Sequence, residues 1–369
     1  MRSVVALVGV AVFLQSHVPP PLVVHEWGTI TTRHGPDGTP EGRLNRIAAE
    51  DTLPSFVHRY EPAATGSDPR NALVKTVITP GRADVTMRLE TPVLYFHPPV
   101  GWRATNPVTV SVRFRGGVLN EFYPNAEPQV SLDADRLNAK VAAGAVPRWD
   151  GVNLSNFVVG QLRWTGLTLR DSVSTPRTTS HVWLAPRHVR SAGVVSPGGE
   201  SERYVFYRGV AHLDAVFQTR LTSSDVRLAA PARLLWLHTD STTIPATWLV
   251  DVRPDGRVAF RAHGAITLAR TAPGRELARL PLFSARDYAA SHVTDLRHAV
   301  KRALTASGLF DDEAEAMLET WKESYFRTPG LRVLHLVPRE WVAYFLPLEI
   351  SVPHVATRVL VGRIDLVER

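Results

Sequence analysis

Residues 23–32 read VVHEWGTITT, a run whose β-branched and aromatic residues are typical of a buried strand. The run nevertheless carries His25, Glu26 and Trp27 side by side. Because successive side chains of a strand point to opposite faces, His25 and Trp27 share one face and Glu26 lies on the other. We expect this strand to form the first edge of a β core, with His25 and Trp27 facing inward and Glu26 paired with an arginine.

Similar strand patterns continue up to about residue 270. Runs rich in β-branched and aromatic residues, each bounded by Pro, Gly or Asn, occupy residues 84–97, 106–124 and 202–221. Residues 247–263 predict a hairpin, because the turn Pro254-Asp255-Gly256 separates two alternating segments. Strands in series that are joined by polar loops are typical of antiparallel sheets stacked as a sandwich. We expect long loops at residues 33–82 and 124–156, which are richer in Gly, Pro, Asn and Asp.

After about residue 284 the hydrophobic period becomes that of a helix. One apolar face over residues 285–307 predicts a helix that ends at Gly308. A second helix is expected over residues 310–326, because three acidic residues occupy its first turn, where the helix dipole favours negative charge. We expect three further elements after it: a strand at 331–337, a short helix that starts at Pro338, and a last strand at 357–367.

The predicted fold class is therefore α+β. A large antiparallel β-sandwich-like part with long loops spans residues 25–270, and a C-terminal region of helices and strands at 284–369 packs on it as a closure. Residues 1–16 combine a basic start at Arg2 with an apolar stretch of about 11 residues, the pattern of a signal peptide. Residues 17–24 read as a Pro-rich spacer. We expect a secreted or periplasmic protein without a transmembrane span.

The amino-acid composition limits which partners the protein can bind and which metal or nucleophile chemistry it can use. The formal net charge is +7, but only four basic residues are lysines and the arginines are scattered singly. This pattern argues against nucleic acid as a partner and favours a polysaccharide or an anionic surface polymer. The chain contains no cysteine, which excludes disulfides, thiolate metal sites and cysteine nucleophiles. A metal would have to be held by His, Asp or Glu.

Several phrases of the sequence resemble a family of exported bacterial proteins that open on His-Glu-Trp-Gly-Thr. They are HEWGT at 25–29, LETPVLYF at 89–96, NEFYPNA at 120–126, YVFYRGVA at 204–211 and GLFDDEAEAMLETWKESYF at 308–326. The resemblance covers most of the mature chain in separate blocks and implies one common fold. Residues 125–200 are least similar to the family. The family carries no assigned activity, so the resemblance implies no catalytic residues.

Glu90 and Glu121 stand in apolar strand segments, where a carboxylate must be paired, hydrogen-bonded, protonated or metal-bound. One interpretation is structural, with Arg88 and Arg208 as their ion-pair partners. The other makes Glu90 and Glu121 the catalytic acid and base of a glycoside hydrolase, with His25 nearby. This hypothesis describes an extracytoplasmic hydrolase that acts on a polysaccharide or an envelope-derived substrate.

The alternative is a secreted protein that binds carbohydrate or a surface without catalysis. Its substrate-binding candidates are Trp27, Tyr95, Tyr123 and Arg208, because aromatic rings interspersed in a β-rich protein can stack on sugars. Tyr207 and Trp321 would extend the same platform if a cleft separated the β part from the terminal helices.

A metal-dependent enzyme with His and carboxylate ligands is a third hypothesis. No cofactor is indicated by a sequence motif, but a divalent metal is possible because many histidines lie near β segments. The metal-ligand candidates are His25, His97 and His212. Their spacing does not show whether they converge. The sequence contains no G-x-S-x-G, phosphate-loop or dinucleotide-binding motif, so whether the protein is an enzyme stays open at this point.

Overall fold

The computed structural model describes residues 20–44, 53–60, 85–102, 107–133 and 157–367. The predicted signal peptide and most of the two predicted long loops lie outside these residues. Strands are the commonest element of the described chain, at 46 % of it against 17 % for helices, and the helices are concentrated toward its C-terminal end. This composition agrees with the predicted α+β class.

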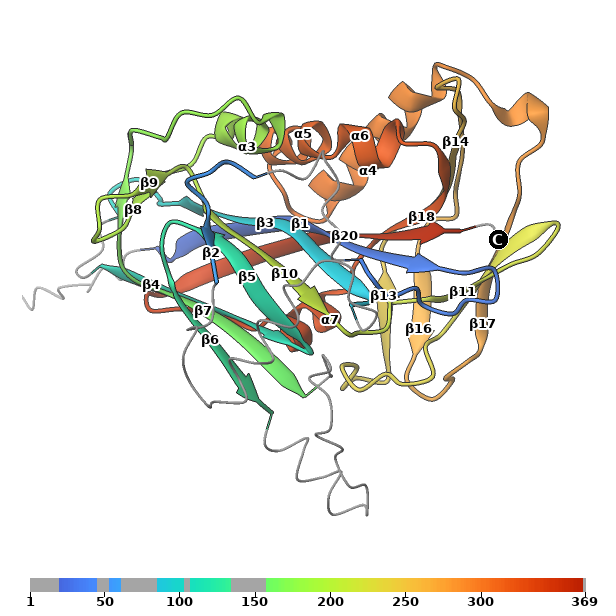
Figure 1. The fold of residues 1–369 in the computed structure, drawn as a ribbon, viewed down its shortest axis with the longest axis horizontal. Coiled ribbons are helices and arrows are strands. Elements are labelled where there is room, and N and C mark those ends of the chain that lie inside the picture. Colours follow the sequence, from blue (N-terminus) through green and yellow to red (C-terminus); the bar gives the residue numbers. More distant parts are fainter. Residues whose placement is uncertain (1–19, 45–52, 61–84, 103–106, 134–156, 368–369) are drawn as a thin grey trace, which may run out of the picture.

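Fifteen of the described strands form one large sheet (Figure 1). Its main path runs through β15 (Val258–Ala262), β14 (Thr247–Val252), β18 (Gly330–Leu336), β20 (His354–Leu366), β1 (Leu22–His34), β3 (Met87–His97), β10 (Val205–Ala211), β5 (Gly117–Tyr123), β7 (Val158–Arg170), β4 (Val108–Arg115) and β19 (Leu348–Ile350). Four short strands branch from this path: β2 (His58–Arg59), β6 (Glu127–Leu132), β8 (Gly193–Val195) and β9 (Ser201–Glu202). The strand β6 falls where a loop was expected.

Strand β1 lies in the middle of this sheet, and the expectation of a first edge is therefore wrong. Its neighbours are β3, which runs antiparallel, and β20, which runs parallel to it over all thirteen residues. The sheet is consequently mixed and not purely antiparallel. The C-terminal region is also not separate from the β part, because β18 and β20 are strands of the main sheet. The expected stacking of two sheets as a sandwich stays a prediction.

Helices and small sheets cover the two faces of the main sheet (Figure 1). The helices on one face are α3 (His181–Leu184), α4 (His292–Ala306), α5 (Asp311–Thr320) and α6 (Lys322–Phe326). The other face carries α7 (Arg339–Phe345) and two small sheets, β11 (Gln218–Leu221) with β12 (Asp225–Ala229) and β17 (Glu276–Pro281), and β13 (Ser241–Ile244) with β16 (Ile266–Ala269). Short 3₁₀ turns lie at Ala185–His188 and Ala285–Asp287.

Each face of the sheet has its own hydrophobic core. Trp27 packs in the core beneath the helices, together with apolar residues of α4 and α5 such as Leu296 and Met317. The hairpin predicted at 247–263 is confirmed as β14 and β15, with Gly256 in the left-handed conformation that its turn requires. The predicted C-terminal strands and the short helix after Pro338 are confirmed as β18, β20 and α7. The helix expected over 285–307 begins only at His292, as α4, and the one expected over 310–326 is divided into α5 and α6 at Trp321.

The predicted alternation along β1 is also confirmed. Glu26 points to the face opposite His25 and Trp27, where it accepts hydrogen bonds from the Arg358 guanidinium and the Tyr207 hydroxyl. All three side chains are more than four-fifths buried. The arginine partner expected for Glu26 therefore comes from β20, the strand that pairs with β1.

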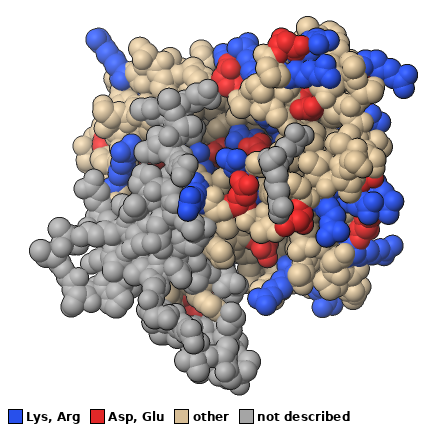
Figure 2. Space-filling view, turned by 45° about the vertical axis from the view of Figure 1, so that its right-hand side comes forward, with Lys and Arg blue, Asp and Glu red and all other residues tan. Residues whose placement is uncertain are grey.

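Charged residues are spread over the surface without a single large basic patch on the side shown. Figure 2 turns the right-hand side of Figure 1 forward, and lysines and arginines are intermingled there with aspartates and glutamates. Among the described residues, no helix is long and apolar enough to cross a membrane.

Gly362 provides a test of how tightly β18 and β20 pack. It pairs with His335, and a Cβ atom at Gly362 would lie 2.2 Å from the His335 ring. We expect Gly362→Ala to lower the free energy of unfolding by about 1 to 3 kcal/mol, because the buried ring cannot move away. Urea unfolding would measure this loss.

The control is Gly198→Ala, whose added methyl group would meet no atom closer than 3.8 Å. In a double-mutant cycle, Gly362→Ala combined with His335→Ala should cost less than the sum of the two single changes. Strict additivity would show that the ring does not restrict this position.

Two buried histidines predict acid sensitivity. Burial lowers the pKa of His335 to about 3 and that of His34 to about 4. The unfolded chain therefore binds these protons first, and the stability that each neutral ring contributes is complete above about pH 6.5 and is lost as the pH falls. We expect the free energy of unfolding to fall by roughly 1 to 2 kcal/mol per histidine between pH 6.5 and pH 5.

Urea midpoints at pH 7, 6 and 5 would measure this slope in the wild type and in two variants. His335→Phe keeps a ring and removes the titration, so its slope should be shallower. Exposed His263→Gln should keep the wild-type slope. Equal slopes in His335→Phe and the wild type would contradict the assignment.

Candidate functional site

Strands β1 and β3 present His25 and His97 to the helix-covered face of the sheet. In their antiparallel register His25 pairs with Tyr95, and His97 follows two residues later on the same face. Glu313 reaches both rings from the first turn of α5. Its carboxylate also accepts a hydrogen bond from the Phe310 backbone N–H at 2.8 Å, which anchors it at the start of this helix.

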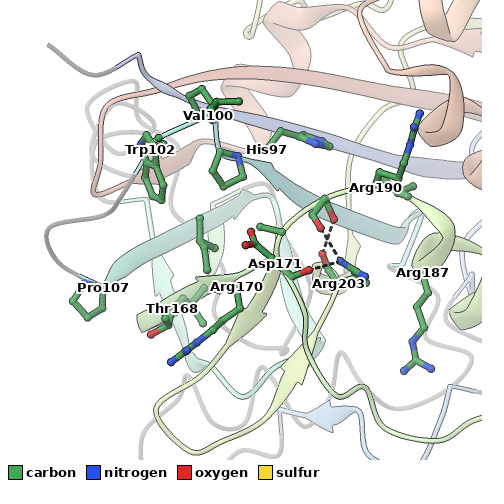
Figure 3. A pocket seen from close by; sticks show the side chains of 18 of the residues that line it. His97, Val100, Trp102, Pro107, Thr168, Arg170, Asp171, Arg187, Arg190 and Arg203 are labelled. Carbon is green, nitrogen blue, oxygen red and sulfur yellow. Dashed lines mark hydrogen bonds between the residues drawn. The ribbon is translucent and has the colours of Figure 1, made fainter. Parts of the chain in front are cut away.

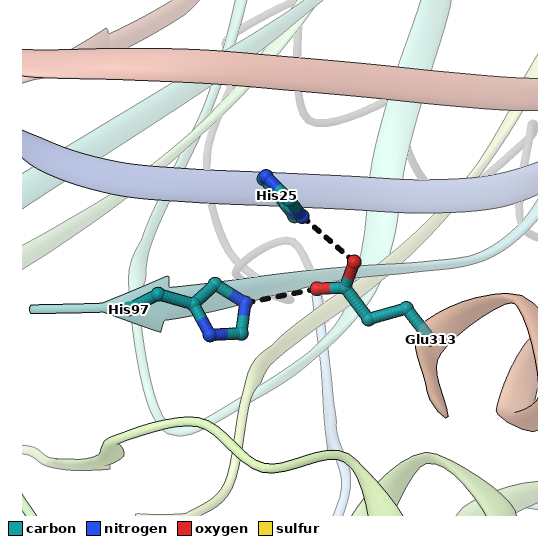
Figure 4. A group of neighbouring side chains, drawn as sticks. All are labelled: His25, His97 and Glu313. Atoms are coloured by element: carbon teal, nitrogen blue, oxygen red, sulfur yellow. Dashed lines mark hydrogen bonds and ion pairs between the residues drawn. The ribbon is translucent and has the colours of Figure 1, made fainter. Parts of the chain in front are cut away.

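The three side chains form one compact cluster (Figure 4). His25 Nδ1 lies 2.7 Å from one carboxylate oxygen of Glu313, and His97 Nε2 lies 2.9 Å from the other. One ligand atom from each residue falls within 4.8 Å of the other two. Glu313 is fully buried and His25 nearly so, whereas the His97 side chain is 13 % exposed. His97 therefore connects the cluster to solvent.

The carboxylate of Glu313 is held in its charged form. Burial alone would raise the pKa of Glu313, but the hydrogen bonds from His25 and His97 outweigh that effect and bring the pKa below its ordinary value. Buried carboxylates elsewhere in the described chain use arginine, as Glu202 does with Arg187. Within the described residues, the ion-pair partners of Glu313 are the two imidazoles.

Two imidazoles and a carboxylate are a donor set that binds Zn²⁺, Fe²⁺ and similar divalent ions. The donor atoms come from two neighbouring strands and a helix that are all packed into the core, so their spacing is set by rigid elements. Three protein ligands leave coordination positions open for water or a substrate. The cluster could therefore hold a metal ion.

A cavity of about 1110 Å³ opens beside His97 (Figure 3). Figure 3 shows His97 between Trp102 on one side and Arg190 on the other. The basic side chains that line the cavity outnumber its single acidic one, Asp171; they are Arg170, Arg187, Arg190, Arg203 and His188. Arg203 is held by the backbone carbonyl of Ser191 at 2.8 Å, whereas the Arg190 side chain is 92 % exposed. Arg187 is paired with Glu202 and Arg190 with Asp312, so the four arginines face three carboxylates and the cavity keeps a small excess of positive charge.

The two glutamates predicted as catalytic residues have arginine partners. Glu90 lies 3.2 Å from the Arg88 guanidinium and accepts a hydrogen bond from Thr31 at 2.9 Å. Glu121 lies 3.3 Å from the Arg59 guanidinium and 3.9 Å from that of Arg208. These contacts agree with the structural interpretation of both residues. Neither carboxylate belongs to the cluster around Glu313.

The candidates for substrate binding lie in the core. Trp27 and Tyr95 are completely buried, Tyr123 and Arg208 are 4 % and 6 % exposed, and Tyr207 is completely buried. None of these side chains offers an open ring face to a sugar in this structure. Arg208 instead donates hydrogen bonds to the Thr91 hydroxyl.

Two of the three histidines predicted as metal ligands lie in the cluster around Glu313, and the third does not. His25 and His97 belong to the cluster, and exposed His212 lies outside it. Glu313 was not among the candidates, because its position suggested only an acidic first turn. Glu313 lies four residues before buried Met317, so it stands on the apolar stripe of α5. A carboxylate on that stripe is the signal that could have identified it.

Comparisons with known proteins place no constraint on the function. The sequence matches no family model and no curated protein. Among solved structures, the chain is similar to the yeast delta-COP-I mu-homology domain complexed with a Dsl1 WxWxV peptide, with a TM-score of 0.24 and 8 % sequence identity. The alignment covers 95 % of this chain and 97 % of that chain. At this TM-score the likeness carries no argument.

Removing Glu313 should destabilise the protein strongly. Glu313→Ala deletes the acceptor of two buried imidazoles and of a backbone N–H at the start of α5. We expect a loss of about 3 to 5 kcal/mol in the free energy of unfolding, measured by urea denaturation.

The matched control is Glu315→Ala on the same helix, which removes partly exposed ion pairs with Arg297 and Lys301. Its cost should be below about 1 kcal/mol. Similar losses in the two variants would show that the cluster contributes no special stability.

Proposed function

We propose that the protein is a metal-dependent hydrolase that acts outside the cytoplasm, with His25, His97 and Glu313 as its metal ligands. The observation that carries this proposal is a fully buried carboxylate that meets two imidazoles and, among the described residues, no arginine or lysine. A buried carboxylate requires a positive partner. A divalent cation between the three donors would meet that requirement.

A metal ion and a proton compete for the same ring nitrogens of the cluster. In the structure Nδ1 of His25 and Nε2 of His97 face the carboxylate at hydrogen-bond distance. To bind a cation, each ring must present a lone pair there and carry its proton on the other nitrogen or lose it. Metal binding therefore competes with protonation, and the affinity should fall as the pH falls.

The cavity beside His97 supports an anionic substrate. Arg190 and Arg203 would hold its negatively charged groups, and Trp102 would contact an apolar or sugar part. When bound, the cation would supply Lewis acidity toward an oxygen of the substrate or of water. The side chains of the cavity would orient the substrate beside His97, which is the ligand at the cavity wall.

The proposed location and substrate class extend the expectations from the sequence. Residues 1–16 and the resemblance to exported bacterial proteins support export, and the arginine-lined cavity supports an envelope-derived anionic polymer or a fragment of one. Glu90 and Glu121 have no part in the proposed reaction, because arginines neutralise both.

Elemental analysis tests the metal site. Wild type, His25→Ala, His97→Ala and the control His188→Ala would be equilibrated with trace Mn²⁺, Fe²⁺, Co²⁺, Ni²⁺ and Zn²⁺ and then freed of unbound metal. His188 lines the same cavity but lies outside the cluster. We expect close to one equivalent of metal in wild type and His188→Ala, and a loss of at least about tenfold in affinity in the other two variants.

The same proteins would then be assayed with phosphate and carboxylate esters of p-nitrophenol. Turnover should require the metal and disappear in His97→Ala. Metal binding without turnover of any ester would retain the site and reject the hydrolase. Absence of metal from the folded wild-type protein would reject both.

A further inference from the structure

A second cavity, of about 900 Å³, lies where β1 and β20 end and β18 begins. It shares no lining residue with the cavity beside His97. Five arginines line it, Arg33, Arg88, Arg253, Arg332 and Arg363, together with three carboxylates, Glu90, Asp251 and Asp365. Glu41 lies beside Arg33 at 3.4 Å, so the cavity retains an excess of positive charge even when this partner is included.

Arg332 is the most deeply buried of these arginines, at 3 % exposed. Its terminal nitrogens donate hydrogen bonds to the backbone carbonyls of Ser324 and Thr328, which are neutral groups. Its nearest carboxylate is Asp365, 3.7 Å from Nε, and Asp365 also lies 3.2 Å from the Arg363 guanidinium. Two buried guanidinium groups therefore share one carboxylate.

Two buried N–H groups in the wall of this cavity have no hydrogen-bond acceptor among the described residues. They are Arg332 Nε and Trp321 Nε1. Both side chains line the cavity, and both are at least nineteen-twentieths buried. A buried N–H without an acceptor is costly. Both nitrogens have less than 1 Å² of exposed surface, so an anionic oxygen in the cavity would accept from them only after the two side chains shift toward it.

Most of the rest of the wall is apolar or aromatic, with Ser324 and Thr328 as the polar exceptions. Phe283 and Tyr288 contribute rings, and the Arg253 guanidinium lies over the Tyr288 ring at 3.7 Å from its centroid. The Tyr288 hydroxyl donates a hydrogen bond to Asp251, which holds this ring in place. The wall can therefore pack against a ring while the arginines bind an attached anionic group.

We propose that this second cavity binds a small organic anion, with a carboxylate or phosphate group near Arg332 and Trp321 and a sugar or similar ring against Tyr288 and Phe283. The site is separate from the His25–His97–Glu313 cluster. Binding there does not depend on the metal.

Calorimetric titration at constant ionic strength would test the site with three probes: glucuronate, inorganic phosphate and glucose. Glucuronate supplies a carboxylate on a sugar ring, phosphate supplies the anion alone, and glucose supplies the ring alone. We expect saturable binding of glucuronate or phosphate and none of glucose. The relative affinity of the two anions identifies which group the cavity selects.

Two variants and one control place the binding in this cavity. Trp321→Phe removes one N–H donor and keeps a ring, and Arg253→Ala removes a wall cation. Each should weaken anion binding about tenfold, a change of about 1.4 kcal/mol. Arg257→Ala is the control, because Arg257 belongs to the same turn, pairs with Asp255 and does not line the cavity. Circular dichroism would confirm that each variant is folded.

Three results would overturn the proposal. They are the absence of saturable binding of both anions to the wild-type protein, equal binding of glucose, and an equal loss in Arg257→Ala and the cavity variants. Binding that persists after treatment with EDTA would agree with a site independent of the metal. Binding that EDTA abolishes would assign the anion to the cavity beside His97 and reject the second site.

Discussion

The parallel pairing of β1 with β20 is the contact on which the rest of the structure depends. It joins the first described strand to the last one along the full thirteen residues of both. Parallel neighbours cannot be joined by a tight turn, and here almost the whole described chain lies between them. Strand β1 is consequently buried on both faces, and its side chains meet residues from the most distant parts of the sequence.

This central position explains why carboxylates in the core need such different partners. Glu26 on one face of β1 is neutralised by Arg358 of β20, whereas Glu313 above the other face meets His25 and His97. A guanidinium stays charged at every relevant pH and closes its ion pair. An imidazole can give up its proton and bind a metal instead. The same need for a counter-charge is thus met by an arginine on one face of β1 and by two imidazoles on the other.

The local elements followed from sequence patterns, because each depends on residues close together in the chain. The hairpin around Gly256 and helices α4 and α5 formed where alternation, helical period and turn residues predicted them. The sequence patterns did not predict which strands pair with one another, because strand order depends on packing between distant segments. For that reason β1 was expected at an edge, and β20 was expected in a separate closing region.

The candidate site divides in the same way. The sequence by itself determined that any metal ligand must be His, Asp or Glu and that His25 and Trp27 share a face, and it left Glu90 and Glu121 open between ion pairing and catalysis. Only the tertiary structure decided that Glu313, 288 residues away from His25, completes the cluster. The physical reason is that alternation sets which face a side chain occupies, whereas the packing of α5 over the main sheet sets what that side chain meets there.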